Sequence, residues 1–448
     1  MVMSKVLQPI TLESTEIHSR KKWPSWASVV KVKVSLSHNI VKLIEKGVHI
    51  PSPFSIDVGE EIPLERIAGD GVTIYPGTRI YGSKTLISSG TKLGYEAPAT
   101  VVDCQTGPDV ELRGGFFKSS IFLRKAAVAS GAQVREGCIL EEESNANHTV
   151  GLKQTILFPF VTLGSLINFC DCFMAGGTSR KNHSEVGSSY IHFNYTPNQD
   201  KATPSLIGDV PRGVMLTQPP IFLGGQGGLV GPVRIGYGSV IAAGVVCRRD
   251  YPKGSRLITE SDISAHDKYF RAGFHKSIKH RVYNNICYIA NLLALRQWYA
   301  HIRQPFFQQE HMGGELYAGA MDKLEIAIDE RLKRFKDLSE KMEKSIEMGK
   351  DAMKNNTQEG LLKQKKELSE NWPRLEETFI SGQEVSFDLK NRDAFIKIIH
   401  NRMKHEGDYI MVIQGLDRDA SIKGTAWLQN LVDHVIHAAL MHLPSCNS

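Results

Sequence analysis

The stretch "VELRGGFFKSSIFLRKAAVASGAQVREGCILEEES", residues 110–144, carries the six-residue repeat that decides the fold. Large apolar residues recur at every sixth position, at Val110, Phe116, Phe122, Val128, Val134 and Leu140. A small residue follows each of them four positions later, at Gly114, Ser120, Ala126, Ala132, Cys138 and Ser144. Neither the period of a helix nor the alternation of a strand produces this pattern.

A triangular parallel β-helix accounts for the repeat. Six residues form each flat face, the large side chain fills the interior, and the small one lies where the chain turns a corner. The same phase recurs upstream and downstream, at Ile74, Ile80, Leu86, Leu157, Leu163, Phe169, Leu223, Leu229, Ile235 and Ile241. We therefore predict a mainly β-solenoid domain over 67–252, with a loop insertion at about 184–220 where the phase breaks.

The segments on either side of the solenoid have a different pattern. Residues 1–66 form an N-terminal arm with the basic segment "SRKKWP", followed by a short amphipathic helix within 35–53. Residues 253–448 carry apolar side chains at helical spacing over 280–302, 321–354, 358–380 and 392–441. They predict a C-terminal α-helical domain.

Composition excludes few classes of function. The 54 basic and 48 acidic residues give a mild formal charge of +6, which suits a small anion as well as a polyanion. We expect a small-molecule partner and no nucleic acid. No apolar run is long enough to span a membrane, and the N-terminus has no secretory signal, so we expect a cytoplasmic protein. The seven scattered cysteines, including Cys170 and Cys172, are interpreted as reduced, buried thiols.

Two stretches carry a resemblance to a known family: "IHFNYTPNQDKATPSLIGD" (191–209) and "PIFLGGQGGLVGPVRIGYGSVIAAGVVCRRD" (220–250). They resemble the acetyltransferase half of the bifunctional UDP-N-acetylglucosamine pyrophosphorylase/glucosamine-1-phosphate acetyltransferase, a hexapeptide-repeat protein, over about 163–250. The resemblance implies a left-handed β-helix, a homotrimer with its active site between subunits, acetyl-CoA as acyl donor, and no metal. The glycine-rich loop of the nucleotidyltransferase half does not occur in this sequence.

The resemblance also implies roles for individual residues. An amine that attacks a thioester has to lose a proton to a base within hydrogen-bond reach, and His183 matches the family's base. Asn194 and Tyr195 match the pair that contacts the sugar and the acyl carbonyl. Two further pairs complete the assignment: Lys181 and Lys201 for the substrate, and Arg248 and Arg249 for a coenzyme A phosphate.

One departure from the family leaves the acceptor open. The related enzymes carry a basic residue on the coil before the base, where this chain reads "FCDCF" (169–173). We expect a coenzyme A-dependent N-acyltransferase acting on a phosphorylated or nucleotide-linked amino sugar. Two alternatives stay open: a non-catalytic sugar-nucleotide-binding regulatory or scaffold protein, and a γ-class carbonic anhydrase-like enzyme with zinc on His148, His183 and His192.

Overall fold

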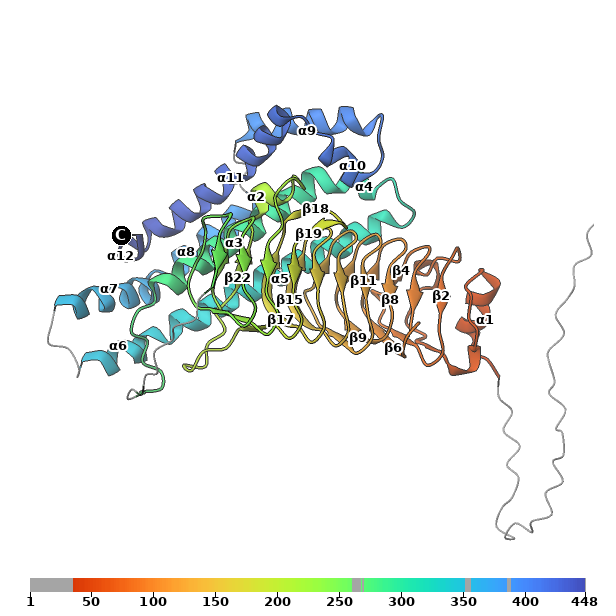
Figure 1. Ribbon diagram of the computed structural model, residues 1–448, viewed down its shortest axis with the longest axis horizontal. Coiled ribbons are helices and arrows are strands. Elements are labelled where there is room, and N and C mark those ends of the chain that lie inside the picture. The colour runs from red at the N-terminus through yellow and green to blue at the C-terminus, as the bar shows by residue number, and fades with distance from the viewer. Residues whose placement is uncertain (1–34, 260–266, 268–269, 351–355, 385–387, 448) are drawn as a thin grey trace, which may run out of the picture. The chain divides into compact units, whose positions relative to one another are not determined.

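The computed structural model describes residues 35–259, 267, 270–350, 356–384 and 388–447. The predicted basic arm at "SRKKWP" lies outside the described residues. The predicted fold class is confirmed: a parallel β-solenoid is followed by a C-terminal helical region (Figure 1). Residues Ser37–Ser448 form one compact unit that contains both parts.

Three flat faces make up the solenoid, and each strand pairs with the strands one coil before and one coil after it. Face 1 is a 10-stranded sheet. Faces 2 and 3 form one 16-stranded sheet, because two strands, β15 and β17, run from face 2 into face 3 without a break.

Face 1 contains β2 (Thr73–Ile74), β5 (Lys92–Leu93), β8 (Glu111–Leu112), β11 (Ala127–Val128), β14 (Asn145–Ala146), β16 (Thr162–Leu163), β20 (Glu185–Val186), β23 (Phe222–Leu223), β26 (Val240–Ile241) and β28 (Leu257–Ile258). Face 2 contains β1 (Asp57–Val58), β3 (Arg79–Tyr81), β6 (Ala99–Val102), β9 (Gly115–Lys118), β12 (Ala132–Val134), the first halves of β15 (Gly151–Leu157) and β17 (Asn168–Met174), β21 (Ile191–Phe193), β24 (Gly228–Val230) and β27 (Val246–Cys247). Face 3 contains β4 (Leu86–Ile87), β7 (Gln105–Thr106), β10 (Ile121–Phe122), β13 (Ile139–Leu140), the second halves of β15 and β17, β22 (Ser205–Ile207) and β25 (Arg234–Ile235).

Columns of apolar side chains fill the interior of the prism. On face 1, Leu93, Leu112 and Val128 pair in parallel register on successive coils, and all three are fully buried. Each coil therefore buries its inner side against its neighbours, as expected for a solenoid. The small residues predicted at the corners are also buried, from Gly114 to Ser144.

The predicted interior position is wrong at Phe116. Its neighbour Phe117 is the fully buried residue, pairs with Val101 and Val134, and packs edge-on against Phe122, whereas Phe116 is only half-buried. The reason is coil length. The coil from Leu112 to its partner Val128 contains fewer residues than the two coils before it. A strict count of six cannot follow coils of unequal length.

Residues that exceed the repeat leave the solenoid at corners. We call the turn from face 1 to face 2 the first corner, that from face 2 to face 3 the second, and that from face 3 to face 1 the third. The range 184–220 contains three solenoid strands, and its extra residues form a second-corner loop at 194–204 and a third-corner segment at 208–221 with helix α2 (Val210–Gly213). An antiparallel hairpin of β18 (Gly177–Ser179) and β19 (Asn182–His183) also leaves the third corner.

Within the described residues, helices occupy the ranges in which the apolar spacing predicted them, and 351–354 lie outside the described residues. The short N-terminal helix is α1 (His38–Glu45), capped by Ser37. The C-terminal helices are α3 (Lys279–Trp298), α4 (Gln304–Phe307), α5 (Gly313–Glu340), α6 (Met342–Lys350), α7 (Asn356–Glu370), α8 (Trp372–Glu384), α9 (Leu389–Met403), α10 (Tyr409–Gln414), α11 (Arg418–Met441) and α12 (Pro444–Asn447). In the part of the chain that the structure describes, none of these helices has the length and apolar character of a membrane span.

Helices α3 and α5 cover face 3 of the solenoid (Figure 1). Arg331 of α5 is buried and forms an ion pair with Asp171 at the second corner. Lys84, near the other end of the solenoid, pairs with Asp322 of the same helix at 3.3 Å. Helix α5 therefore runs along several coils.

A buried polar cluster holds the helical region at the third corner. The hydroxyl of Tyr299 donates a hydrogen bond to Glu141, and the Arg303 guanidinium forms an ion pair with Glu142. Burial raises the pKa of Glu141 to about 7, and the nearby Arg303 charge only partly opposes this effect. Protonation of Glu141 therefore favours the folded state.

The first prediction tests the observed register. We expect Phe117→Ala to destabilise the protein by about 3–5 kcal/mol, because a fully buried aromatic side chain leaves a cavity. The matched variant Phe116→Ala is expected to cost about 1 kcal/mol, since that side chain is only half-buried. Urea-induced unfolding followed by circular dichroism measures both. Equal losses, or a larger loss at Phe116, would contradict the register.

The second prediction concerns pH. The folded state retains a proton on Glu141 between about pH 4.5 and 7 that the unfolded state releases, so stability falls as pH rises through this window. Glu141→Gln should remove this loss, on the order of 1–3 kcal/mol. The variant should match the wild type at pH 5 and exceed it at pH 8 in urea unfolding.

Two buried histidines change the pH dependence of stability in the opposite direction, and they do so in the wild type and in Glu141→Gln alike. The difference between the stability–pH curves of the two proteins is therefore the informative quantity. Burial lowers the pKa of His192 and of His275 to about 4, which makes stability rise with pH below neutrality. Parallel profiles for wild type and Glu141→Gln would show that Glu141 does not titrate in this window.

Candidate functional site

The second-corner loop at 194–204 carries three of the residues singled out by sequence. Tyr195 has 55% of its surface exposed, and Lys201 is also exposed. Asn194 is half-buried, and its Nδ2 donates a hydrogen bond of 2.8 Å to Asp171 Oδ2. Because Asp171 is held by Arg331 of α5, the position of Asn194 depends on the helical region.

The chain's own helices fix this loop. Arg281 of α3 pairs with the buried carboxylate of Asp200 at 3.4 Å. Asn285 donates to the Ala202 carbonyl at 3.0 Å, and Lys341 Nζ donates to the Gln199 carbonyl at 2.6 Å. The loop is therefore a fixed part of one chain, from which Tyr195 projects.

Arg248 and Arg249 lie at the same corner, two coils beyond Asn194. His192 of β21 pairs with Leu229 of β24, and Leu229 pairs with Cys247 of β27. The two arginines directly follow β27, just as Asn194 directly follows β21, so they occupy the same corner. At about 4.8 Å per coil, the two positions are about 10 Å apart along the axis. The Arg249 guanidinium lies over the Tyr251 ring, with its Nε 3.0 Å from the Tyr251 hydroxyl.

A hollow of about 520 Å³ lies beside Arg249 at the end of the solenoid. Arg249, Lys253 and Arg256 line it, together with Asp250 and Tyr251, whereas Arg248 does not. Sequence analysis missed Lys253 and Arg256. The signal was the basic segment "RRDYPKGSR" (248–256), in which four cations occur within nine residues.

His183 and Lys181 lie at the third corner, in the β18–β19 hairpin. His183 Nδ1 is 2.8 Å from the Arg180 carbonyl, which can only accept, so Nδ1 carries the proton in the neutral ring and Nε2 is left as the basic atom. Nε2 is 3.7 Å from a Glu185 carboxylate oxygen, and 19% of the side chain is exposed. Lys181 lies at the exposed hairpin turn.

Two contacts fasten the hairpin to the rest of the molecule. Arg180 Nη1 donates to the Glu143 and Phe160 carbonyls and to the Thr162 hydroxyl, each at 2.9 Å. Gln414 of α10 donates to the Thr178 carbonyl at 2.6 Å. These hydrogen bonds therefore fix the position of the hairpin that carries His183.

The structure does not bring all the predicted residues together in one chain. Asn194, Tyr195, Lys201, Arg248 and Arg249 share the second corner, whereas Lys181 and His183 share the third. Face 3 and its covering helices lie between the two corners. A site with His183 and Asn194 side by side needs a second copy of the chain.

The three histidines of the zinc alternative also lie apart. His148 is exposed at the first corner and contacts Glu96 at 3.2 Å. His192 is inside the prism, where its ring nitrogens bond to the Cys170 carbonyl and the Ser205 hydroxyl. Among the described residues, no three His, Cys, Asp or Glu side chains gather as metal ligands would.

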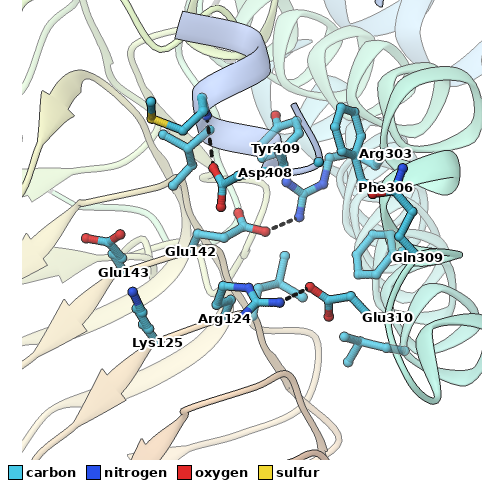
Figure 2. Close-up of a pocket in the computed structure, with 16 residues that line it drawn as sticks. Arg124, Lys125, Glu142, Glu143, Arg303, Phe306, Gln309, Glu310, Asp408 and Tyr409 are labelled. Atoms are coloured by element: carbon cyan, nitrogen blue, oxygen red, sulfur yellow. Dashed lines mark hydrogen bonds and ion pairs between the residues drawn. The ribbon is translucent and has the colours of Figure 1, made fainter. Parts of the chain in front are cut away.

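A pocket of about 560 Å³ lies between the third corner and the helices (Figure 2). Its facing walls are joined by two ion pairs, Arg303 with Glu142 and Arg124 with Glu310. The Arg303 guanidinium also lies over the Tyr409 ring, 3.8 Å from its centroid. Because these charges are paired across the pocket, we interpret its residues primarily as contacts that connect the solenoid to the helices.

Comparison with known proteins agrees with the resemblance. No family model matches the chain. It is similar to the bifunctional protein GlmU of Thermotoga maritima, with 28% identity over 242 residues, which cover 54% of this chain and 47% of the relative. Similar matches occur in Clavibacter sepedonicus, with 28% identity over 208 residues (46% and 37%), and Synechococcus elongatus, with 25% over 223 residues (50% and 44%). The chain spans about half the length of the curated relatives it matches, and the resemblance to hexapeptide-repeat proteins of the GlmU type is confirmed over that part.

Proposed function

We propose that this protein is a coenzyme A-dependent N-acyltransferase that acetylates a phosphorylated or nucleotide-linked amino sugar. The observation that carries the proposal is the arrangement at the second corner. There the exposed Tyr195 and the oriented Asn194 precede a cation-lined hollow by two coils. The similarity to the GlmU proteins supports the same conclusion.

In this mechanism His183 is the general base. Its Nε2 takes a proton from the acceptor amine while the amine nitrogen attacks the acetyl carbonyl. A C–N bond forms, the C–S bond of the thioester breaks, and the departing sulfur leaves as the thiol after it receives the proton. Asn194 keeps one amide proton that Asp171 does not use, and this proton can bind the oxygen of the tetrahedral intermediate.

The phosphates of acetyl-CoA fit the hollow at the end of the solenoid. Arg249, Lys253 and Arg256 supply three cations there, and guanidinium groups bind phosphate oxygens in pairs. Coenzyme A would then lie along the second corner, with its thioester toward Tyr195. Arg248, exposed beside the hollow, and Lys201 complete the positive edge.

The proposed assembly is a cytoplasmic homotrimer. His183 and Asn194 lie apart in one chain. They come together if the third corner of one copy packs beside the second corner of its neighbour. Lys181, at the tip of the hairpin, then approaches the acceptor from the neighbouring copy.

A second candidate is a sugar-nucleotide-binding regulatory or scaffold protein without catalysis. The observation that favours it is the fixation of the 194–204 loop by Arg281, Asn285 and Lys341, because the loop is held even in a single chain. Acetyl-CoA binding distinguishes the two candidates.

The third prediction concerns acetyl-CoA. Calorimetry should show saturable binding that Arg249→Ala weakens about tenfold, in line with the loss of one charge-assisted hydrogen bond. His183→Ala should bind acetyl-CoA as the wild type does, yet release thiol 10²–10⁴-fold more slowly with an amino-sugar acceptor, as about that much is lost with a general base. No acetyl-CoA binding by the wild type would leave only the regulatory candidate.

The fourth prediction tests the shared site. His183→Ala and Asn194→Ala should each be nearly inactive, but mixed trimers formed by co-expression should recover about a quarter of wild-type activity, because some sites receive both intact residues. The control is co-expression of His183→Ala with the double variant, which supplies no intact site. No recovery in the mixed trimers would mean that the two residues do not act together across copies.

A further inference from the structure

Three basic side chains stand next to one another on the outer side of face 2. Val134 pairs in parallel register with Phe117 on the coil before it and with Leu152 on the coil after it. The residues that follow these three are Lys118, Arg135 and Lys153, so they occupy the same outward position on successive coils. Lys118 and Arg135 are exposed, and Lys153 is half-buried. We call Lys118, Arg135 and Lys153 the cation ladder.

Carboxylates neutralise the cation ladder only in part. On face 1, Lys92 pairs with Glu111 of the next coil at 3.1 Å. In the cation ladder, Lys153 pairs with Glu136 at 2.7 Å, but in the described part of the chain neither Lys118 nor Arg135 has an ion-pair partner. Like charges directly opposite in a sheet are destabilising, so the fold gains nothing from this arrangement.

The column of the cation ladder continues toward the candidate site. Lys153 pairs with Cys170, and the next coil brings Phe193, which is 43% exposed and immediately precedes Asn194. At about 4.8 Å per coil, Phe193 lies about 10 Å from Lys153 along the axis. An exposed aromatic side chain therefore separates the cations from Asn194 and offers an apolar surface for a sugar ring.

We propose that the cation ladder binds the diphosphate of a nucleotide-linked amino sugar, so that the acceptor is a sugar nucleotide and not a sugar monophosphate. This inference rests on the proposed function and specifies its substrate. Three cations at successive coils span about 10 Å, so two linked phosphates can contact more of them at once than a single phosphate can. Arg135, between the two lysines, can hold oxygens of both phosphates with its planar guanidinium.

The next coil carries no cation in the column of the ladder. The buried Cys170 occupies that position, in register with Lys153. Arg135 Nη2 is 4.0 Å from the Cys170 sulfur. Positive charge at this edge of face 2 is thus supplied by the coils that precede the coil of Cys170.

The test is calorimetric titration of the full-length protein with UDP, UMP and glucosamine 1-phosphate at low salt. We expect UDP to bind at least tenfold more tightly than either monophosphate, and Lys118→Ala and Arg135→Ala each to weaken UDP binding about tenfold. Arg79→Ala is the matched control, because Arg79 is an exposed cation of face 2 outside the ladder, opposite Asp57 of the neighbouring strand. It should leave UDP binding unchanged.

Thermal unfolding of the same variants shows that they fold. Removing Lys118 or Arg135 relieves repulsion between like charges, so their midpoints should be equal to or above that of the wild type. Equal affinity for UDP and the monophosphates, or UDP binding that Arg135→Ala and Arg79→Ala affect alike, overturns the inference.

The results also separate this inference from the proposed function. Thiol release from acetyl-CoA with glucosamine 1-phosphate as acceptor, without UDP binding, overturns the diphosphate site and leaves the acyltransferase standing. Ladder-dependent UDP binding without acetyl-CoA binding supports the diphosphate site and refutes the acyltransferase.

Discussion

The parallel register between coils is the constraint on which the rest of this structure depends. A residue in one coil has as its neighbours the residues at the same position one coil before and one coil after. Inward positions therefore become buried columns, such as Leu93, Leu112 and Val128 on face 1. An extra residue inside a strand would shift a whole column, so the extra residues leave at corners, as the 194–204 loop and the β18–β19 hairpin do.

The helical region contacts the solenoid from outside at particular coils. Its contacts to the solenoid include buried ion pairs, Arg331 with Asp171 and Arg303 with Glu142. Such pairs add little net stability, because both ions lose their hydration, but an ion left without its partner is costly. They therefore act mainly to fix which coil each helix contacts. Since Asp171 also accepts from Asn194, the helix that covers face 3 positions a residue of the candidate site.

Sequence alone predicted the solenoid, the helical ranges and a loop insertion around Asn194, because each depends on a local period or motif. It did not predict that Phe117 would replace Phe116 in the interior, since coil length varies and only the pairing between coils shows the slip. Sequence also did not predict that His183 and Asn194 lie at different corners, because their separation of eleven residues along the chain does not determine which corner each occupies. The cation ladder was missed for the same reason: Lys118, Arg135 and Lys153 become neighbours only once the coils are in register.

The covering of face 3 restricts how two copies can meet. In many solenoids any of three faces could serve as a contact surface, but here α3 and α5 occupy one of them. The hairpin with His183 stands at one border of that covered face and the loop with Asn194 at the other. A neighbouring copy that unites them has to approach along face 1 or face 2, with its third corner against the second corner of its partner. Such an approach leaves the cation ladder beside the shared cleft, because the ladder lies on the edge of face 2 that leads into the second corner. In the proposed assembly, the covering helices and the cation ladder are compatible with one arrangement, in which the acceptor lies along face 2 and His183 comes from the neighbouring chain.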